Sequence, residues 1–253
     1  MKQIVVIDPG MMEAGGHHAA FMETLIHSES EGSKISMLTH QQLDNDLETK
    51  AKNSGIQVYR FFSINFYQHY EDSLDLNISG IQNYIRQMAR EYACAIKLGV
   101  KQSELREVIC FYPCLNWEHA FGVSLALELI GKRGGMGITH KLTHKVCCMF
   151  TPIRRQFNSD LYYRMAFSRL SIQKGVSLFA SDKETQEYYQ LLEVPIQGIH
   201  PCYLLPWQRL NVNKVNTSSV PNLLIYMGDA KENKGFLRLP SLVKQLLLWL
   251  CSD

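Results

Sequence analysis

The sequence lacks several features that would each indicate a particular class of protein. Its seven cysteines include no Cys-x-x-Cys pair, and their odd number does not suit a secreted disulfide framework. No stretch approaches the roughly 20 apolar residues of a transmembrane helix, and the first apolar run, 4–7, is too short for a signal peptide. We therefore expect reduced thiols, no metal centre and a cytoplasmic protein.

Strong charge of either sign is also missing. The formal net charge is +2, and there is no basic tail, so nucleic acid is not expected as a partner. What is present is the composition of a folded globular protein, with 46% hydrophobic and 20% charged residues. A chain of 253 residues lies between one large domain and two smaller ones.

Short apolar runs alternate with longer segments of helical periodicity through the first 200 residues. The runs predicted as strands are 3–8, 34–39, 56–62, 108–112, 145–150, 176–180 and 196–199. The predicted helices include 41–53, 78–98, 118–130, 160–173 and one that Ser181 caps with Glu184 in a capping box. Strands separated by helices predict an α/β fold, a parallel sheet with helices on both faces.

The alternation of strand and helix patterns is interrupted at residues 207–221, where Asn, Ser, Thr and Pro predict a linker. Residues 1–206 are thus predicted to form the first domain. A strand at 223–227, a glycine turn and a helix from about 236 to 250 then restart the pattern. One strand and one helix cannot bury their apolar faces alone, so 222–253 is predicted to be the first β/α unit of an incomplete second domain.

The loop after the first strand is the first candidate site, since parallel sheets bind ligands beyond the carboxyl ends of their strands. Gly15 and Gly16 would let a ligand approach the backbone, and a neutral His17 could donate to a sugar hydroxyl or phosphate oxygen. The spacing is not Gly-x-Gly-x-x-Gly, which argues against a nicotinamide site. A tight turn with a capping histidine is the alternative.

A second candidate is the glycine turn at 226–236. Lys231 and Lys234 precede a predicted helix, where the helix dipole favours anions rather than cations. Two lysines in this place are better explained by a bound anion such as a diphosphate. A solvated charged turn is the alternative.

Two further candidates follow later strands of the first domain. Asn116, Trp117, Glu118 and His119 come after the strand 108–112, where Trp117 could stack on a sugar ring and an acid or histidine could orient a hydroxyl. Their alternative is that Glu118 stabilises the N-terminus of the following helix and His119 is a filler. The basic and aromatic segment 152–174 includes Arg154 and Arg155 and could hold an acidic or lipid-diphosphate acceptor at a membrane face. Its alternative is an ordinary amphipathic helix packed on the sheet.

Several of these motifs resemble glycosyltransferases built from two Rossmann-like domains, the GT-B architecture. The resemblance lies in Gly15-Gly16-His17, in the turn from Gly228 to Lys234-Gly235-Phe236, and in the segment "SLFASDKETQEYYQLLEVPIQGIHPCY". It implies a Rossmann-like acceptor-side domain, 1–206, followed by the start of a nucleotide-sugar domain. It also implies transfer of a sugar from a nucleotide-diphosphate sugar to a glycan, lipid or similar acceptor, without a metal or other cofactor.

The same resemblance assigns roles to the candidate residues. The donor-binding set is Gly15, Gly16, Lys231 and Lys234; the catalytic set is His17, Glu118 and His119; the acceptor-binding set is Asn116, Trp117, Arg154 and Arg155. Asp229 occupies the position where the family more often has arginine, and the family's Glu-x7-Glu element has no counterpart in these residues. A nucleotide-sugar epimerase-like enzyme and a non-catalytic sugar- or nucleotide-binding module are the alternative functions. We expect a cytoplasmic protein with possible peripheral contact at the inner membrane face.

Overall fold

The computed structural model describes residues 2–13, 16–30, 32–64, 78–103, 105–132, 141–148 and 159–200, together with 240, 241 and 244. The chain divides into two units, Met1–Leu205 and Pro206–Asp253. The predicted linker and nearly all of the predicted second β/α unit lie outside the described residues, so both remain predictions. The fold below is that of the first unit.

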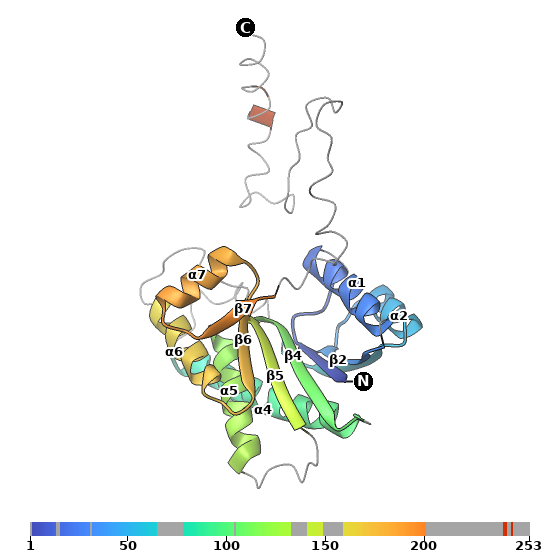
Figure 1. Cartoon of the computed structure of the whole chain (residues 1–253), viewed down its shortest axis with the longest axis horizontal. Coiled ribbons are helices and arrows are strands. Elements are labelled where there is room, and N and C mark those ends of the chain that lie inside the picture. The colour runs from blue at the N-terminus through green and yellow to red at the C-terminus, as the bar shows by residue number, and fades with distance from the viewer. Residues whose placement is uncertain are drawn as a thin grey trace. The chain divides into compact units, whose positions relative to one another are not determined.

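Seven parallel strands form one sheet in the order β3-β2-β1-β4-β5-β6-β7 (Figure 1). The strands are β1 (Gln3–Asp8), β2 (Lys34–His40), β3 (Gln57–Phe62), β4 (Glu107–Leu115), β5 (Lys141–Cys148), β6 (Val176–Ala180) and β7 (Ile196–Ile199). The chain builds outward from β1 to β3, returns to the centre, and then builds outward again from β4 to β7. This reversal between β1 and β4 defines a doubly wound, Rossmann-like α/β fold and confirms the predicted class.

Helices cover both faces of the sheet, as predicted. They are α1 (Gly16–Ser30), α2 (Asn45–Asn53), α4 (Ile78–Lys101), α5 (Trp117–Lys132), α6 (Ser159–Ser171) and α7 (Lys183–Leu191). Successive residues of β1 point to opposite faces, so Val5 and Ile7 join the larger hydrophobic core while Val6 joins the smaller one. The larger core includes residues of α4 to α7, and the smaller core includes residues of α1 and α2.

Helix α4 returns the chain from the end of β3 to the start of β4 and packs very closely on the centre of the sheet. A Cβ atom at Gly99 would lie 2.4 Å from Cγ1 of Val5, closer than real carbon atoms approach. Because α4 runs opposite to the strands, its first turns lie at the carboxyl edge of the sheet. Gly99 lies in the last turn of α4, so this close approach is at the end of the helix that faces away from the carboxyl edge.

Three element boundaries differ from the sequence predictions, and side-chain hydrogen bonds explain two of them. Asp44 accepts from the backbone N–H groups of Asp46 and Leu47, so α2 begins at Asn45 rather than at 41. The predicted capping box at Ser181 is wrong, because Asp182 caps α7 by accepting from Thr185 N at 2.7 Å. Strand β4 continues to Leu115, past a shift in its register with β5.

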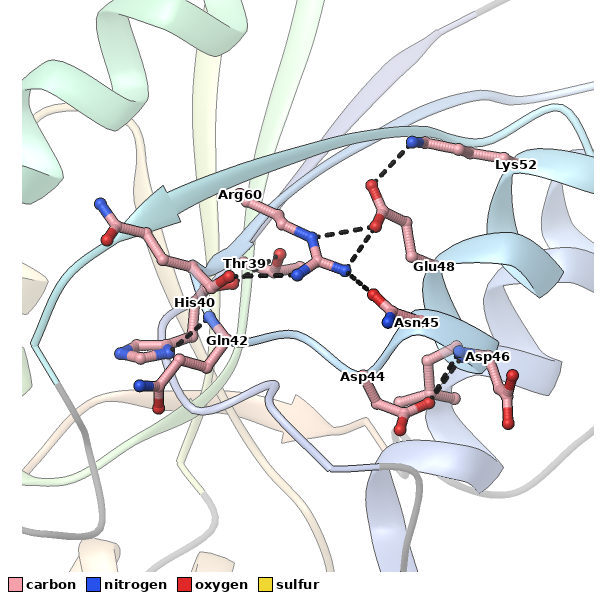
Figure 2. Close-up of polar contacts among 11 residues, drawn as sticks. Thr39, His40, Gln42, Asp44, Asn45, Asp46, Glu48, Lys52 and Arg60 are labelled. Atoms are coloured by element: carbon pink, nitrogen blue, oxygen red, sulfur yellow. Dashed lines mark hydrogen bonds and ion pairs between the residues drawn. The ribbon is translucent and has the colours of Figure 1, made fainter.

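A polar network joins α2 to the outer strand β3 at the rim of the sheet (Figure 2). The Arg60 guanidinium donates to Glu48, to the Asn45 side chain at 2.7 Å and to the Gln41 carbonyl at 3.2 Å. Lys52 contacts the second oxygen of Glu48 at 2.7 Å. The Lys52 ammonium and then the Arg60 guanidinium hold the pKa of Glu48 below its ordinary value. This cluster, the Arg60 network, is only partly shielded from solvent.

Candidate functional site

The topological switch point between β1 and β4 is the place where open parallel sheets of this order bind ligands. Two turns meet there. Asp8 ends β1 and is 4% exposed, and its Oδ1 accepts from Gly10 N at 2.9 Å, which closes the turn after the strand. Asn116 follows β4 directly and starts the turn into α5.

The start of α1 differs electrostatically from the start of most other helices in the unit. No acidic residue occupies its first turn, whereas α2, α5, α6 and α7 each carry one or more acids there. Gly16, a predicted donor-binding residue, is the first residue of α1. Gly15 and the side chain of His17 lie outside the described residues. The partial positive charge of this helix terminus is therefore not offset by an acid of its own first turn.

His18 fixes the first turn of α1 against the loop. Its ring is 6% exposed, and Nδ1 lies 3.3 Å from the Glu13 carbonyl, to which it can donate a hydrogen bond. Burial lowers the pKa of His18, with smaller opposing contributions from Glu13. A neutral His18 adds no positive charge beside the helix dipole.

Asn116 acts as the N-cap of α5. It is fully buried, and its Oδ1 accepts from His119 N at 2.8 Å, which satisfies one of the free N–H groups of the first turn. This bond fixes the start of α5 relative to β4. Binding of an acceptor by Asn116 stays a prediction.

His119 lies in the core between two tyrosines of α4. Its Nε2 is 2.8 Å from the Tyr84 hydroxyl and its Nδ1 is 2.6 Å from the Tyr92 hydroxyl. His119 and Tyr92 are both 0% exposed, and Tyr84 is half-buried. For His119 to act directly on a substrate, one of these hydrogen bonds would have to break. Its catalytic role stays a prediction.

Glu118 is buried next to the same helices. Burial, followed by the Glu118 carboxylate, raises the pKa of both Tyr84 on α4 and Tyr163 on α6. The predicted sugar-stacking residue Trp117 lies one position earlier and stacks on Tyr162 of α6, with ring centroids 4.9 Å apart. The turn from 116 to 119 thus brings an aromatic pair and a carboxylate together at the carboxyl edge of β4.

The described part of the chain therefore contains the four predicted residues 116–119 and the backbone of Gly16. Arg154, Arg155, Lys231 and Lys234 lie outside it. Sequence reasoning missed Tyr84 and Tyr92. Their signal was present, because Tyr84, Met88 and Tyr92 recur at helical spacing within 78–98, but such a stripe is far more often only core.

Within the described residues, no three His, Cys, Asp or Glu side chains gather as a metal ion would require. The five cysteines in those ranges form no disulfide with one another. No helix among them is long and apolar enough to cross a membrane.

Comparison with known proteins includes a weak structural likeness. No protein-family model matches the sequence, and no curated protein matches it. The solved structure of spinosyn rhamnosyltransferase SpnG complexed with thymidine diphosphate is similar with a TM-score of 0.29 and 12% sequence identity. The alignment covers 72% of this chain and 45% of that one, so this chain spans less than half its length. A TM-score this low does not establish a shared fold, and the Rossmann-like assignment rests on the strand order alone.

Proposed function

We propose that the first unit is the acceptor-side domain of a glycosyltransferase of the GT-B architecture. The reaction is transfer of a sugar from a nucleotide-diphosphate sugar to a hydroxyl of a glycan, lipid or similar acceptor. The observation that carries the proposal is that two features belong to the switch point, the start of α1 and the turn 116–119. The start of α1 has no acid and suits a diphosphate, while the turn 116–119 offers Glu118 and aromatic rings to a sugar.

The reaction requires a different contribution from each of these two features. The bond from the sugar C1 to the acceptor oxygen forms, the bond from C1 to the diphosphate oxygen breaks, and the diphosphate leaves with that electron pair. The α1 N–H groups and the predicted contacts of Lys231 and Lys234 would stabilise this leaving group. The proton of the acceptor hydroxyl goes to a base, for which His17 and Glu118 are the candidates. Glu118 is the one whose side chain is described.

A lipid-linked acceptor at the inner membrane face is part of the same proposal. It is supported by large apolar side chains that α6 exposes beside the Trp117–Tyr162 pair. These are Leu161 (49% exposed) and Met165 (51%), and Tyr162 of the pair is itself 43% exposed. The predicted contacts of Arg154 and Arg155 with an acidic acceptor belong to this part of the proposal.

Thermal shift with UDP, TDP, GDP and ADP tests the donor side of the proposal. A nucleoside diphosphate at 100 times its dissociation constant stabilises the folded state by about 2.7 kcal/mol, which raises Tm by roughly 5–10 °C in a unit of this size. Gly16→Asp places a negative charge at the start of α1 and should abolish the shift. Gly198→Asp, at a position of β7 with no neighbouring atom within 4 Å, should leave it intact.

The outcomes separate the alternatives. No response to any nucleoside diphosphate, in a form that includes the donor domain, would count against the transferase and the epimerase-like enzyme alike. A response that Gly16→Asp leaves unchanged would remove α1 from the donor site. Binding without release of sugar from any nucleotide-diphosphate sugar, in a form that includes the donor domain, would favour the non-catalytic binding module.

A further inference from the structure

His40 ends β2 at the carboxyl edge of the sheet and contains a nitrogen with which no described residue pairs. The residue is 3% exposed, and among the residues that the structure describes its Nε2 makes no hydrogen bond. Figure 2 shows this nitrogen pointing away from the other residues drawn. A buried N–H group without an acceptor is costly, so its place at the ligand edge of a parallel sheet requires an explanation.

The backbone fixes which nitrogen of His40 carries the hydrogen. The Gln42 N–H donates to Nδ1 at 3.1 Å, so Nδ1 is an acceptor and has no hydrogen. A neutral imidazole has one hydrogen, which must then lie on Nε2. Burial lowers the pKa of His40, which keeps the ring neutral at pH 7. Nε2 is therefore a donor, and it cannot take a proton from a substrate.

The neighbours of His40 determine the charge at this part of the edge. His40 is the register partner of Phe62. The next residue, Ser63, donates to the Glu91 carboxylate from its backbone N–H at 3.2 Å and from its hydroxyl. The Ser63 backbone and Glu91 oppose the lowering of the His40 pKa by burial, but neither makes a hydrogen bond with Nε2. The Arg60 guanidinium is engaged in its own network. A nearby carboxylate therefore disfavours a negatively charged oxygen as the partner of Nε2–H.

Backbone hydrogen bonds hold the loop after β2 against the loop after β1. Leu43 N donates to the His40 carbonyl at 3.1 Å, and Asp44 N donates to the Met12 carbonyl at 2.7 Å. Strand β2 is the neighbour of β1 in the sheet, on the side away from β4. His40 therefore lies at the same edge as the switch point, one strand further out.

We propose that His40 is a binding residue whose Nε2–H donates a hydrogen bond to an uncharged oxygen of a ligand at the carboxyl edge of β2. The ligand class is a neutral sugar, whose hydroxyl and ring oxygens are uncharged acceptors. A phosphate or carboxylate is held less tightly, because its negative oxygens face Glu91. The choice of a sugar rests on the proposed function, whereas the donor on Nε2 does not.

Nitrogen NMR of the chain with labelled histidine rings tests the donor and its contact together. We expect the His40 signals, assigned by their loss in His40→Asn, to show the hydrogen on Nε2 at pH 7. Titration with methyl α-glucopyranoside should shift the Nε2 signal of His40 and leave the signals of His144 unchanged, since His144 is buried in the core. A hydrogen on Nδ1, or a His40 signal that the sugar moves at no concentration, would overturn the proposal.

The variant His40→Asn separates a ligand contact from a structural one. Asparagine keeps an oxygen for the Gln42 N–H but has no donor at the position of Nε2. We expect methyl α-glucopyranoside to bind about 5-fold more weakly, the size of one lost neutral hydrogen bond, with little change in Tm. Tyr59→Phe removes a hydroxyl that donates to Gln57 on β3 and should change neither. Unchanged sugar binding would overturn the proposal, and a fall in Tm beside it would show that Nε2–H is bonded within the fold.

Failure of this inference can be distinguished from failure of the proposed function. If nucleoside diphosphates stabilise a form that includes the donor domain but the sugar does not move the His40 signal, the inference is wrong and the transferase proposal stands. If the sugar moves the signal while no nucleoside diphosphate binds, His40 keeps its role and the non-catalytic binding module is favoured. Tighter binding of glucose 6-phosphate than of methyl α-glucopyranoside would overturn the neutral ligand class. If His40→Asn fails to fold, the titration of the unmodified chain decides the question.

Discussion

The molecule places two polar clusters in opposite settings. Under α4 to α7, His119 and His144 are buried among tyrosines, with His144 2% exposed and its Nδ1 3.0 Å from the Tyr112 hydroxyl. Beside α2, the Arg60 network lies at the rim, where the Arg60 and Glu48 side chains are 32% and 17% exposed. The buried cluster pairs imidazole rings with tyrosine hydroxyls away from solvent. The rim cluster has charged partners and water as an alternative.

This difference determines what each cluster can do. A buried neutral histidine has one allowed protonation state, so its hydrogen bonds have a defined direction and its folding stability depends on pH. An exposed ion-pair network can lose one member while water solvates the rest, so it contributes little to stability and carries no fixed direction. Buried histidines are accordingly the part of the unit from which a site can be built.

The largest expected effect is the pH dependence that His144 imposes on stability. Burial lowers the pKa of His144 to about 4, whereas an unfolded chain has a value near 6.5. Between these values the unfolded chain binds a proton that the folded chain does not, so stability is complete above about pH 6.5 and falls as the pH drops toward 4. The difference corresponds to about 3 kcal/mol in the free energy of unfolding.

Urea unfolding at pH 7 and at pH 4.5 measures this loss. His144→Asn keeps an oxygen near the position of Nδ1 but cannot take up a proton. Because it cannot be protonated, the variant should lose less stability on acidification. It should also be less stable than the unmodified chain at pH 7. His18 and His40, whose pKa values burial also lowers, and Glu48, whose pKa the Lys52 and Arg60 contacts lower, contribute in the same direction. An unchanged pH slope in His144→Asn would show that the buried cluster is not the source.

An intermediate effect is expected where α4 positions the buried tyrosines against the sheet. Gly99→Ala introduces a Cβ atom 2.4 Å from Val5 Cγ1, and overpacking of this kind costs about 1–3 kcal/mol. The matched control is Gly131→Ala in α5, which meets no atom within 4 Å and should gain up to about 1 kcal/mol from helix propensity. Thermal or urea unfolding measures the change in stability of both variants. Equal changes would mean that the close contact between Gly99 and Val5 is not needed for α4 to pack on the sheet.

The smallest effect is expected at the rim. Arg60→Ala removes the contacts with Glu48, Asn45 and the Gln41 carbonyl, yet solvent exposure and screening should keep the loss within about 1 kcal/mol and reduce it further in high salt. Lys141→Ala, which removes the more exposed pair with Glu107, should change nothing measurable. If Arg60→Ala lost as much stability as the unmodified chain loses on acidification, the two clusters would not differ in the way described.

Much of the layout was predictable from local sequence, because several strands end where their apolar runs end. The predicted bounds of β1, β6 and β7 match the structure, and the parallel order of strands and helices follows from their alternation. The turn 116–119 was also predictable as an edge feature, since it follows a strand directly. Boundaries failed where a side chain outside the apolar pattern caps a helix, as Asp44 and Asp182 do.

The sequence by itself therefore determined the α/β class and the position of the turn 116–119 directly after a strand; ligand binding at that edge of the sheet stays a prediction. Only the tertiary structure decided that Asn116 serves as a helix cap and that His119 is enclosed by Tyr84 and Tyr92. Local sequence encodes the period and the ends of each element, because these depend on near neighbours. Which side chains of α4 meet those of α5 depends on how two helices pack across the same sheet, and no stretch of either helix contains that information alone.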